Sequence, residues 1–208
     1  MLCASGGGRT DHGTLRRFHE FWTSDNTDPV TRVRMQWACS HFFPASTMAA
    51  HVTRWGERPM DFACAVALSG RFGLDLDLAA LSDDDLEVCR RAVAVAKRTQ
   101  DLVQQGDLAR LVSPVEGDDT SRAALSYTSP DRRRSVVFAY QLDVPAGEPP
   151  LVRPVDIDPE RDYRVVEVSL TGDESEAIAV AGRQLREGVP WRLDEACTAQ
   201  ILELTAID

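Results

Sequence analysis

The sequence predicts an α/β region followed by an all-β region, with the change near Gly106. Up to about residue 105, strand-like apolar runs alternate with segments of helical spacing, which is the pattern of βα units around a parallel sheet. From residue 106 onward, short alternating runs separated by turn-rich stretches indicate a small antiparallel β-sandwich. We therefore predict two domains, residues 1–105 and residues 106–208.

The first half opens with an aromatic-rich run at residues 18–23 that suits a strand. After it, Asp28 can cap the free backbone N–H groups of a helix, and Pro29 suits the first helical position. Apolar side chains then recur at helical spacing, at Val30, Val33 and Trp37. We expect a helix that begins directly after Asp28 and buries this face.

The rest of the first half contains one clear helix and two weaker elements. Residues 48–52 suit a buried strand end, whereas residues 62–68 suit either a helix or a strand. The clear helix covers residues 82–104, because Ser82 can cap it and the acidic residues 83–85 complement its positive N-terminal end. Its apolar face is predicted at Leu86, Cys89, Val93 and Ala96 or Lys97.

The second half contains four runs that suit strands, at residues 123–127, 135–142, 163–170 and 200–204. Residues 145–150 hold three prolines and a glycine, so they cannot form regular structure, and residues 156–159 suit a turn.

The composition is that of a folded globular protein, with 43% hydrophobic and 27% charged residues. Lys and Arg total 23 against 33 Asp and Glu, and the resulting net charge of −10 argues against nucleic acid or an anionic membrane as the main partner. We therefore expect a neutral ligand, no nucleic acid and no membrane.

The cysteines and histidines give no sign of a disulfide framework or a metal site. The five cysteines are scattered and form no C-x-x-C pair, which favours a reducing compartment. His12, His19, His41 and His51 show no ligand spacing. The start of the chain has no signal-peptide pattern, and no apolar stretch approaches the roughly 20 residues that span a bilayer. We expect a cytoplasmic protein without a metal.

Two stretches could carry chemistry. Residues 3–9 hold a glycine cluster that lets a backbone pass close to a ligand, although taken alone a flexible N-terminus explains it better. Residues 21–28 read as a strand that ends in two carboxylates beside Trp22. Asp28 is explained as a helix cap that supports the site, whereas Asp25 has no structural explanation. Asp25 is therefore either a solvated loop residue or a catalytic one.

The two stretches resemble motifs of a known enzyme family. Cys-Ala-Ser-Gly-Gly-Gly-Arg at residues 3–9 and Trp-Thr-Ser-Asp-Asn-Thr-Asp at residues 22–28 are similar to consecutive motifs of glycoside hydrolase family 36 α-galactosidases, the melibiases, in the same order and at close to the same spacing. Phe43-Pro44, Met48 to His51 and residues 106–117 agree. The resemblance implies the last three strand–helix units of a TIM (β/α)8 barrel, then an antiparallel β domain.

The resemblance also implies residue roles. Asp25 would be the general acid/base, and Cys3 and Gly6 would lie against the hydroxyl groups of the sugar, with Cys3 suiting galactose better than an N-acetylated sugar. From the residues alone, Cys3 is also explained as a small buried thiol. Trp22 either lines the pocket or belongs to the core, and Arg32 either braces the carboxylates or faces water.

One half of the expected active site is missing from the sequence. Retaining hydrolysis needs two carboxyl groups roughly 5 Å apart, and Asp25 supplies one. In the family, the nucleophilic aspartate ends a Lys-Trp-Asp-type strand before the cysteine motif, and this sequence has no such strand. We therefore expect a C-terminal portion of the enzyme that is inactive alone: a gene fragment, a misplaced start codon or one half of a split enzyme.

The expected ligand is an α-galactoside oligosaccharide of the melibiose or raffinose type, and no cofactor is implied. Open sheet edges predict a homo-oligomer or association with a missing N-terminal half. Two alternatives stay open: a non-catalytic carbohydrate-binding or interaction protein built on this scaffold, and a galactosyltransferase that builds raffinose-type sugars.

Overall fold

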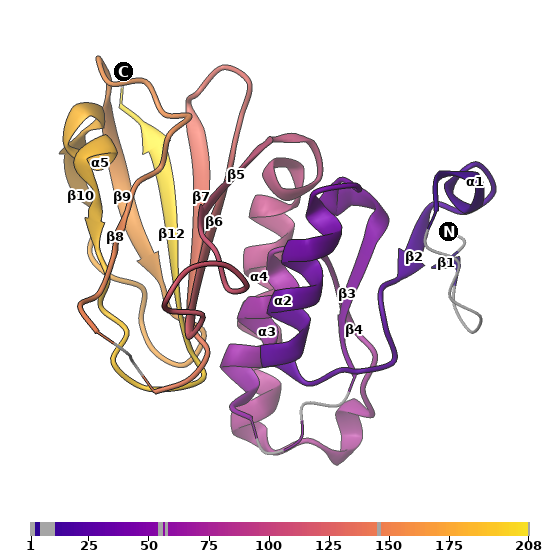
Figure 1. Cartoon of the computed structure of the whole chain (residues 1–208). Coiled ribbons are helices and arrows are strands. Elements are labelled where there is room, and N and C mark those ends of the chain that lie inside the picture. Colours follow the sequence, from indigo (N-terminus) through magenta and orange to yellow (C-terminus); the bar gives the residue numbers. More distant parts are fainter. Residues whose placement is uncertain (1–2, 5–10, 54–55, 57, 145–146, 208) are drawn as a thin grey trace. The chain divides into compact units, whose positions relative to one another are not determined.

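The computed structural model describes residues 3–4, 11–53, 56, 58–144 and 147–207, which form two compact units, residues 1–104 and 105–208. Unit 1 contains a parallel sheet and the helices beside it (Figure 1). Its strands are β1 (Cys3–Ala4), β2 (Glu20–Trp22), β3 (Met48–Val52) and β4 (Arg71–Leu74), and its helices are α1 (His12–Leu15), α2 (Pro29–Ser40), η1 (Ala45–Thr47), α3 (Met60–Leu68), η2 (Leu78–Ala80) and α4 (Asp83–Gln105). The predicted α/β region is confirmed.

The sheet of unit 1 has the strand order β1-β2-β3-β4, and each neighbouring pair is parallel. The resemblance implied three strand–helix units, and the structure has in addition the two-residue strand β1, which pairs with β2. A strand of two residues beside a glycine cluster has too few side chains to show an alternating pattern, so the sequence did not reveal it.

Helix α2 begins where its sequence predicts. The Asp28 side chain accepts a hydrogen bond from the Thr31 backbone N–H at 3.0 Å, and Pro29 occupies the first turn. Val30, Val33 and Trp37 are buried, as expected from their spacing. Residues 62–68, which suited either element, belong to helix α3, in which all but one of the nine residues are buried.

Helix α4 confirms the predicted start and corrects the predicted face. The hydroxyl of Ser82 accepts a hydrogen bond from the Asp85 N–H at 3.2 Å. The predicted apolar face is displaced, because Leu86 is 36% exposed and Val93 is only half-buried. The buried side chains are Val88, Cys89, Ala92, Val95, Thr99, Leu102 and Val103. Residues 92–96 of this helix are all apolar, so more than one stripe fits helical spacing.

The two faces of the parallel sheet differ in chemistry. Helices α2, α3 and α4 gather on one side of the strands (Figure 1), and α3 packs on β3 and β4. Because side chains alternate along a strand, the pairing register puts one set on the other face: Cys3, Glu20, Trp22, Ala49, His51, Arg71 and Gly73. At the first residues of β2 and β4, Arg71 Nε lies 2.8 Å from Oε2 of buried Glu20.

Unit 2 is an antiparallel β structure, as predicted. Its main sheet has the order β10-β9-β12-β7-β6-β5, and a two-stranded ladder joins β11 and β8. The strands are β5 (Asp107–Val112), β6 (Arg122–Thr128), β7 (Arg134–Gln141), β8 (Leu151–Val152), β9 (Asp162–Val168), β10 (Ile178–Ala181), β11 (Val189–Pro190) and β12 (Thr198–Ala206), with helix α5 (Gly182–Glu187). One core cluster joins the main sheet, β8, α5 and Trp191.

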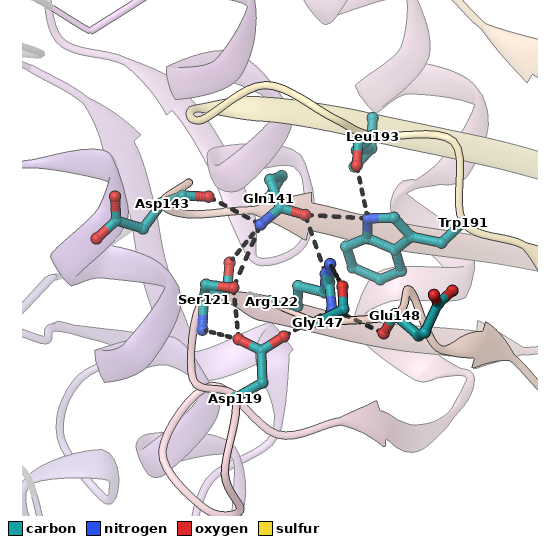
Figure 2. A network of polar contacts seen from close by, with 9 residues as sticks. All are labelled: Asp119, Ser121, Arg122, Gln141, Asp143, Gly147, Glu148, Trp191 and Leu193. Atoms are coloured by element: carbon teal, nitrogen blue, oxygen red, sulfur yellow. Dashed lines mark hydrogen bonds and ion pairs between the residues drawn. The ribbon is translucent and has the colours of Figure 1, made fainter. Parts of the chain in front are cut away.

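A buried arginine organises one end of the unit 2 core (Figure 2). Arg122 is 3% exposed, and its Nη1 lies 2.7 Å from Oδ2 of Asp119. The same guanidinium donates to the backbone carbonyls of Gly147, at 3.2 Å, and Glu148, at 3.1 Å. A buried charge is tolerated only when it is paired and hydrogen-bonded, and Arg122 has both kinds of partner.

The side chain of Gln141 continues this network (Figure 2). Its Oε1 accepts from Arg122 Nε at 3.2 Å and from Trp191 Nε1 at 3.1 Å. Its Nε2 donates to the carbonyls of Ser121, at 3.2 Å, and Asp143, at 2.8 Å. Gln141 is 0% exposed, so these bonds replace the water that its amide would otherwise bind.

Candidate active site

A polar cavity of about 590 Å³ opens at the carboxyl ends of the parallel strands of unit 1. It is lined by side chains from all four strands and the segments that follow them: Cys3, Trp22, Asp25, Thr27, His51, Thr53 and Asp75. Loops after parallel strands are the usual location of active sites in α/β enzymes, because they converge on one edge of the sheet.

Asp25 lies on the loop between β2 and α2, and it is exposed to the cavity. Successive hydrogen bonds shape this loop: Ser24 Oγ accepts from the Asn26 N–H at 3.1 Å, and Asn26 Oδ1 accepts from the Asp28 N–H at 3.0 Å. The carboxylate of Asp25 forms no hydrogen bond within the described residues, so it is available to a ligand.

Asp28 serves the structure of the same loop. Its Oδ1 accepts from the Thr31 N–H at 3.0 Å, and its Oδ2 lies 3.0 Å from Arg58 Nε. Partial burial by itself would raise the pKa of this carboxyl, but the hydrogen bonds from Thr31 and Arg58 outweigh it and lower the pKa. Asp28 is therefore a helix cap held as a carboxylate, and the predicted cap is confirmed.

Arg32 neither braces the carboxylates nor faces water, the two alternatives that the sequence left open. It is 4% exposed, and it donates to the Thr23 hydroxyl, to the Ser24 carbonyl at 3.1 Å and to the Ala49 carbonyl at 3.0 Å. Its Cζ lies 4.5 Å from the centroid of the Trp22 ring. Arg32 thus ties the loop that carries Asp25 to strand β3. Sequence reasoning missed this role because Arg32 bonds mainly to backbone carbonyls.

Cys3 lines the cavity on β1, whereas Gly6 lies outside the described residues. Partial burial, with the nearby Glu20 carboxylate, raises the pKa of the Cys3 thiol. At neutral pH the side chain is therefore a thiol, which suits packing or weak hydrogen bonding and not attack as a thiolate. Trp22 is half-buried and contributes to the cavity wall, so it is not purely a core residue.

Besides Thr27, which lies on the same loop as Asp25, three further side chains in the cavity were not predicted: His51, Thr53 and Asp75. They follow or end strands β3 and β4, so parallel pairing brings them to the same edge as Asp25. The ring centroids of His51 and Trp22 are 5.6 Å apart. In the sequence, these polar residues stand at the ends of two apolar runs. That position indicates a shared site only when the two runs are known to be neighbouring parallel strands.

A second cavity, of about 420 Å³, lies within unit 2 and is lined largely by aliphatic side chains of β9, β10, α5 and β12. The Glu167 carboxylate on its wall lies 3.6 Å from Arg192. Its described lining residues include no aromatic ring and no cluster of unpaired polar groups, so this cavity is the weaker candidate for an active site.

The fold and the polar cavity are typical of α/β proteins that bind their ligands at the carboxyl ends of parallel strands. In the part of the chain that the structure describes, no helix combines the length and apolar character needed to cross a bilayer. Nor do three potential metal-binding side chains meet among those residues.

The profile of the Melibiase family matches residues 2–106. Alpha-galactosidase AgaA of Geobacillus stearothermophilus is 32% identical over 202 residues, which cover 92% of this chain and 27% of AgaA. Alpha-galactosidase C of Emericella nidulans is 38% identical over 172 residues, covering 78% of this chain and 22% of that relative. The crystal structure of the GH36 α-galactosidase AgaB from Geobacillus stearothermophilus matches with a TM-score of 0.84 and 31% identity, over 99% of this chain and 28% of AgaB. The chain belongs to the glycoside hydrolase family 36 α-galactosidases, the melibiases.

The chain spans about a quarter of the length of these relatives. Crystal structures of AgaA variants contain raffinose in one case and stachyose in another. The residues discussed above therefore correspond to one part of a longer enzyme in these relatives, and that part includes the polar cavity.

Proposed function

We propose that this chain carries the proton-donating side of an α-galactosidase active site, with Asp25 as the general acid/base. A carboxylic acid in this role protonates the departing glycosidic oxygen and then, as a carboxylate, activates water. The observation that carries the proposal is the location of Asp25 on the loop after β2, in the same cavity as Cys3 and Trp22. The local bonds of Ser24 and Asn26 leave the Asp25 carboxylate free for this task.

The proposed ligand is an α-galactoside oligosaccharide of the melibiose or raffinose type. Support comes from the α-galactosidase relatives and from the raffinose complex of AgaA. The carboxylates of Asp25 and Asp75 repel anions, which favours a neutral sugar in this cavity. In this proposal Cys3 and Gly6 lie against sugar hydroxyl groups, and Trp22 offers a ring face to the sugar.

We further propose that residues 1–105 are the C-terminal part of a (β/α)8 barrel and that residues 106–208 are its β-sandwich domain. The all-parallel order of β1 to β4 supports the barrel, and the match to AgaB over 99% of the chain supports both parts. Among the described strands, β1 and β4 each pair with one neighbour, so each has an open edge. Those edges would pair with the remaining barrel strands, which would also bring the nucleophilic carboxylate.

A chimaera tests the role of Asp25. Residues 1–208 replace the matching segment of AgaA, and the product is assayed on melibiose and on an aryl α-galactoside with an activated leaving group. Asp25→Ala should lower kcat/KM for melibiose by about 10²–10⁴-fold and affect the activated substrate far less, because a good leaving group needs no proton. Asp84→Asn on the surface of α4 is the matched control. Equal losses on both substrates would remove this role from Asp25.

The unaltered 208-residue chain tests where the second carboxyl group lies. We expect it to show no turnover of an aryl α-galactoside, since the proposal takes the nucleophile from outside these residues. Turnover at ordinary enzyme rates would refute that expectation, and Asp75 would then be the first carboxylate to substitute, because it shares the cavity with Asp25.

A further inference from the structure

His51 lies on the cavity face of β3 and has no part in the proton transfer proposed for Asp25. Its ring is half-buried, and its centroid is 5.6 Å from that of Trp22 at an interplanar angle of 58°. This aromatic contact supports the imidazole from the side of strand β2 and limits the orientations that it can adopt.

The neighbouring strand leaves a space that the His51 ring fills. Gly73 on β4 is the register partner of His51. A Cβ atom at position 73 would lie 2.4 Å from His51 Cδ2 and 2.7 Å from its Nε2, so any other residue would displace the ring. The same Cβ would lie 2.9 Å from His51 Cγ, so the three distances place it above the face of the ring near Cδ2, and Gly73 leaves the space that this face of the imidazole occupies.

The imidazole has hydrogen-bonding capacity that the protein does not use. Among the described residues, neither ring nitrogen of His51 has a hydrogen-bond partner, although the ring is held by Trp22 and Gly73. The same cavity carries the hydroxyl groups of Thr27 and Thr53. Such a mixture of donors and acceptors suits a ligand whose own groups both donate and accept, as sugar hydroxyls do.

We propose that His51 is a substrate-binding residue whose imidazole hydrogen-bonds a hydroxyl group of the galactoside bound beside Asp25, and that Gly73 is the positioning residue that makes room for it. This inference rests on the proposed function of the cavity. It adds a contact from strands β3 and β4 to a site that the motifs of residues 3–9 and 22–28 describe only from the side of β1 and β2.

The test measures binding, so it needs no turnover. The 208-residue chain is titrated with methyl α-D-galactopyranoside while the amide and imidazole NMR signals are followed. We expect saturable shifts at the His51 ring, and His51→Ala should weaken binding about tenfold, as the loss of one hydrogen bond to a sugar would. His51→Phe, which keeps an aromatic ring but has no ring nitrogen, should lose as much affinity as His51→Ala.

Gly73→Ala tests whether the position of the His51 ring matters, because it moves the ring without removing it. It should weaken binding about as much as His51→Ala, because the added Cβ pushes the imidazole away. Gly172→Ala in unit 2 is the matched control, since the nearest atom to its Cβ is Ser169 Oγ at 3.5 Å, an ordinary contact. Each variant must keep the dispersed amide spectrum of the parent.

Two results would overturn the inference: no galactoside-dependent shift at His51 in the parent chain, or unchanged affinity in His51→Ala. The proposal for Asp25 would fail separately, through equal losses on both substrates of the chimaera. If His51→Ala kept the parental affinity while the loss in Asp25→Ala depended on the leaving group, the proposed function would stand and only the role of His51 would be rejected.

Discussion

The two units each contain a polar cluster, and the clusters differ in how far their members satisfy one another. In unit 2, Gln141 accepts hydrogen bonds from Arg122 and Trp191 and donates to Ser121 and Asp143, while Arg122 is paired and buried. In unit 1, no hydrogen bond of the Asp25 or His51 side chains is found among the described residues, and both face a cavity. A saturated network holds structure together, whereas held but unsatisfied groups at a cavity are available to a ligand.

The largest effect that this comparison predicts is on the stability of unit 2. Arg122→Ala should lower the free energy of unfolding by about 3 kcal/mol, because it removes a buried guanidinium together with its ion pair to Asp119 and its hydrogen bonds to Gln141 and to the Gly147 and Glu148 carbonyls. Urea unfolding followed through the amide signals of β7 measures it. Arg90→Ala, at an exposed ion pair with Glu87, is the control and should leave unfolding unchanged. A loss for Arg122→Ala no larger than that of the control would contradict a structural role for the network.

A smaller effect on stability is expected at Asp28, which lies only three residues from Asp25 but, unlike Asp25, has hydrogen-bond partners within the protein. Asp28→Ala should cost about 1 kcal/mol at pH 7, because the N-cap of α2 is lost. Asp28→Ser, which keeps a capping oxygen, should cost less.

The pH dependence of this effect follows from the lowered pKa of Asp28. The pKa of the Asp28 carboxyl is lower in the folded state than its value of about 4 in the unfolded state. The carboxylate therefore contributes its full stabilisation of the fold at pH values above about 4. That stabilisation is lost as the pH falls through the folded value. The difference between the parent and Asp28→Ala in urea unfolding should therefore shrink as the pH is lowered below about 4. A difference that is independent of pH would show that the charge of Asp28 does not contribute.

The smallest effect is expected at Asp25 itself. Asp25→Asn should change the free energy of unfolding by less than about 0.5 kcal/mol, because the described structure holds no partner for its carboxylate. Urea unfolding of unit 1, followed through the amide signals of β3, checks this. A loss comparable to that of Asp28→Ala would mean that Asp25 is a structural residue, and the contrast between the two clusters would no longer hold.

The elements that were predicted well are those whose ends are fixed by their own residues. Asp28 with Pro29 and Ser82 with residues 83–85 mark helix starts through bonds and charges within a few positions, and both helices begin there. The face of α4 was predicted wrongly, because several stripes fit helical spacing and the choice depends on the surfaces that it meets. Strand β1 was too short to predict, and it is defined by its pairing with β2.

The sequence determined on its own the division near residue 106, the caps of the main helices and the family, since each depends on composition or on residues adjacent in the chain. Tertiary structure decided which distant side chains meet: His51 and Asp75 beside Asp25, Gly73 beneath the imidazole, and Arg32 under the loop. The physical reason is that parallel pairing aligns the carboxyl ends of strands separated by 20 or more residues, and this alignment has no counterpart in local spacing.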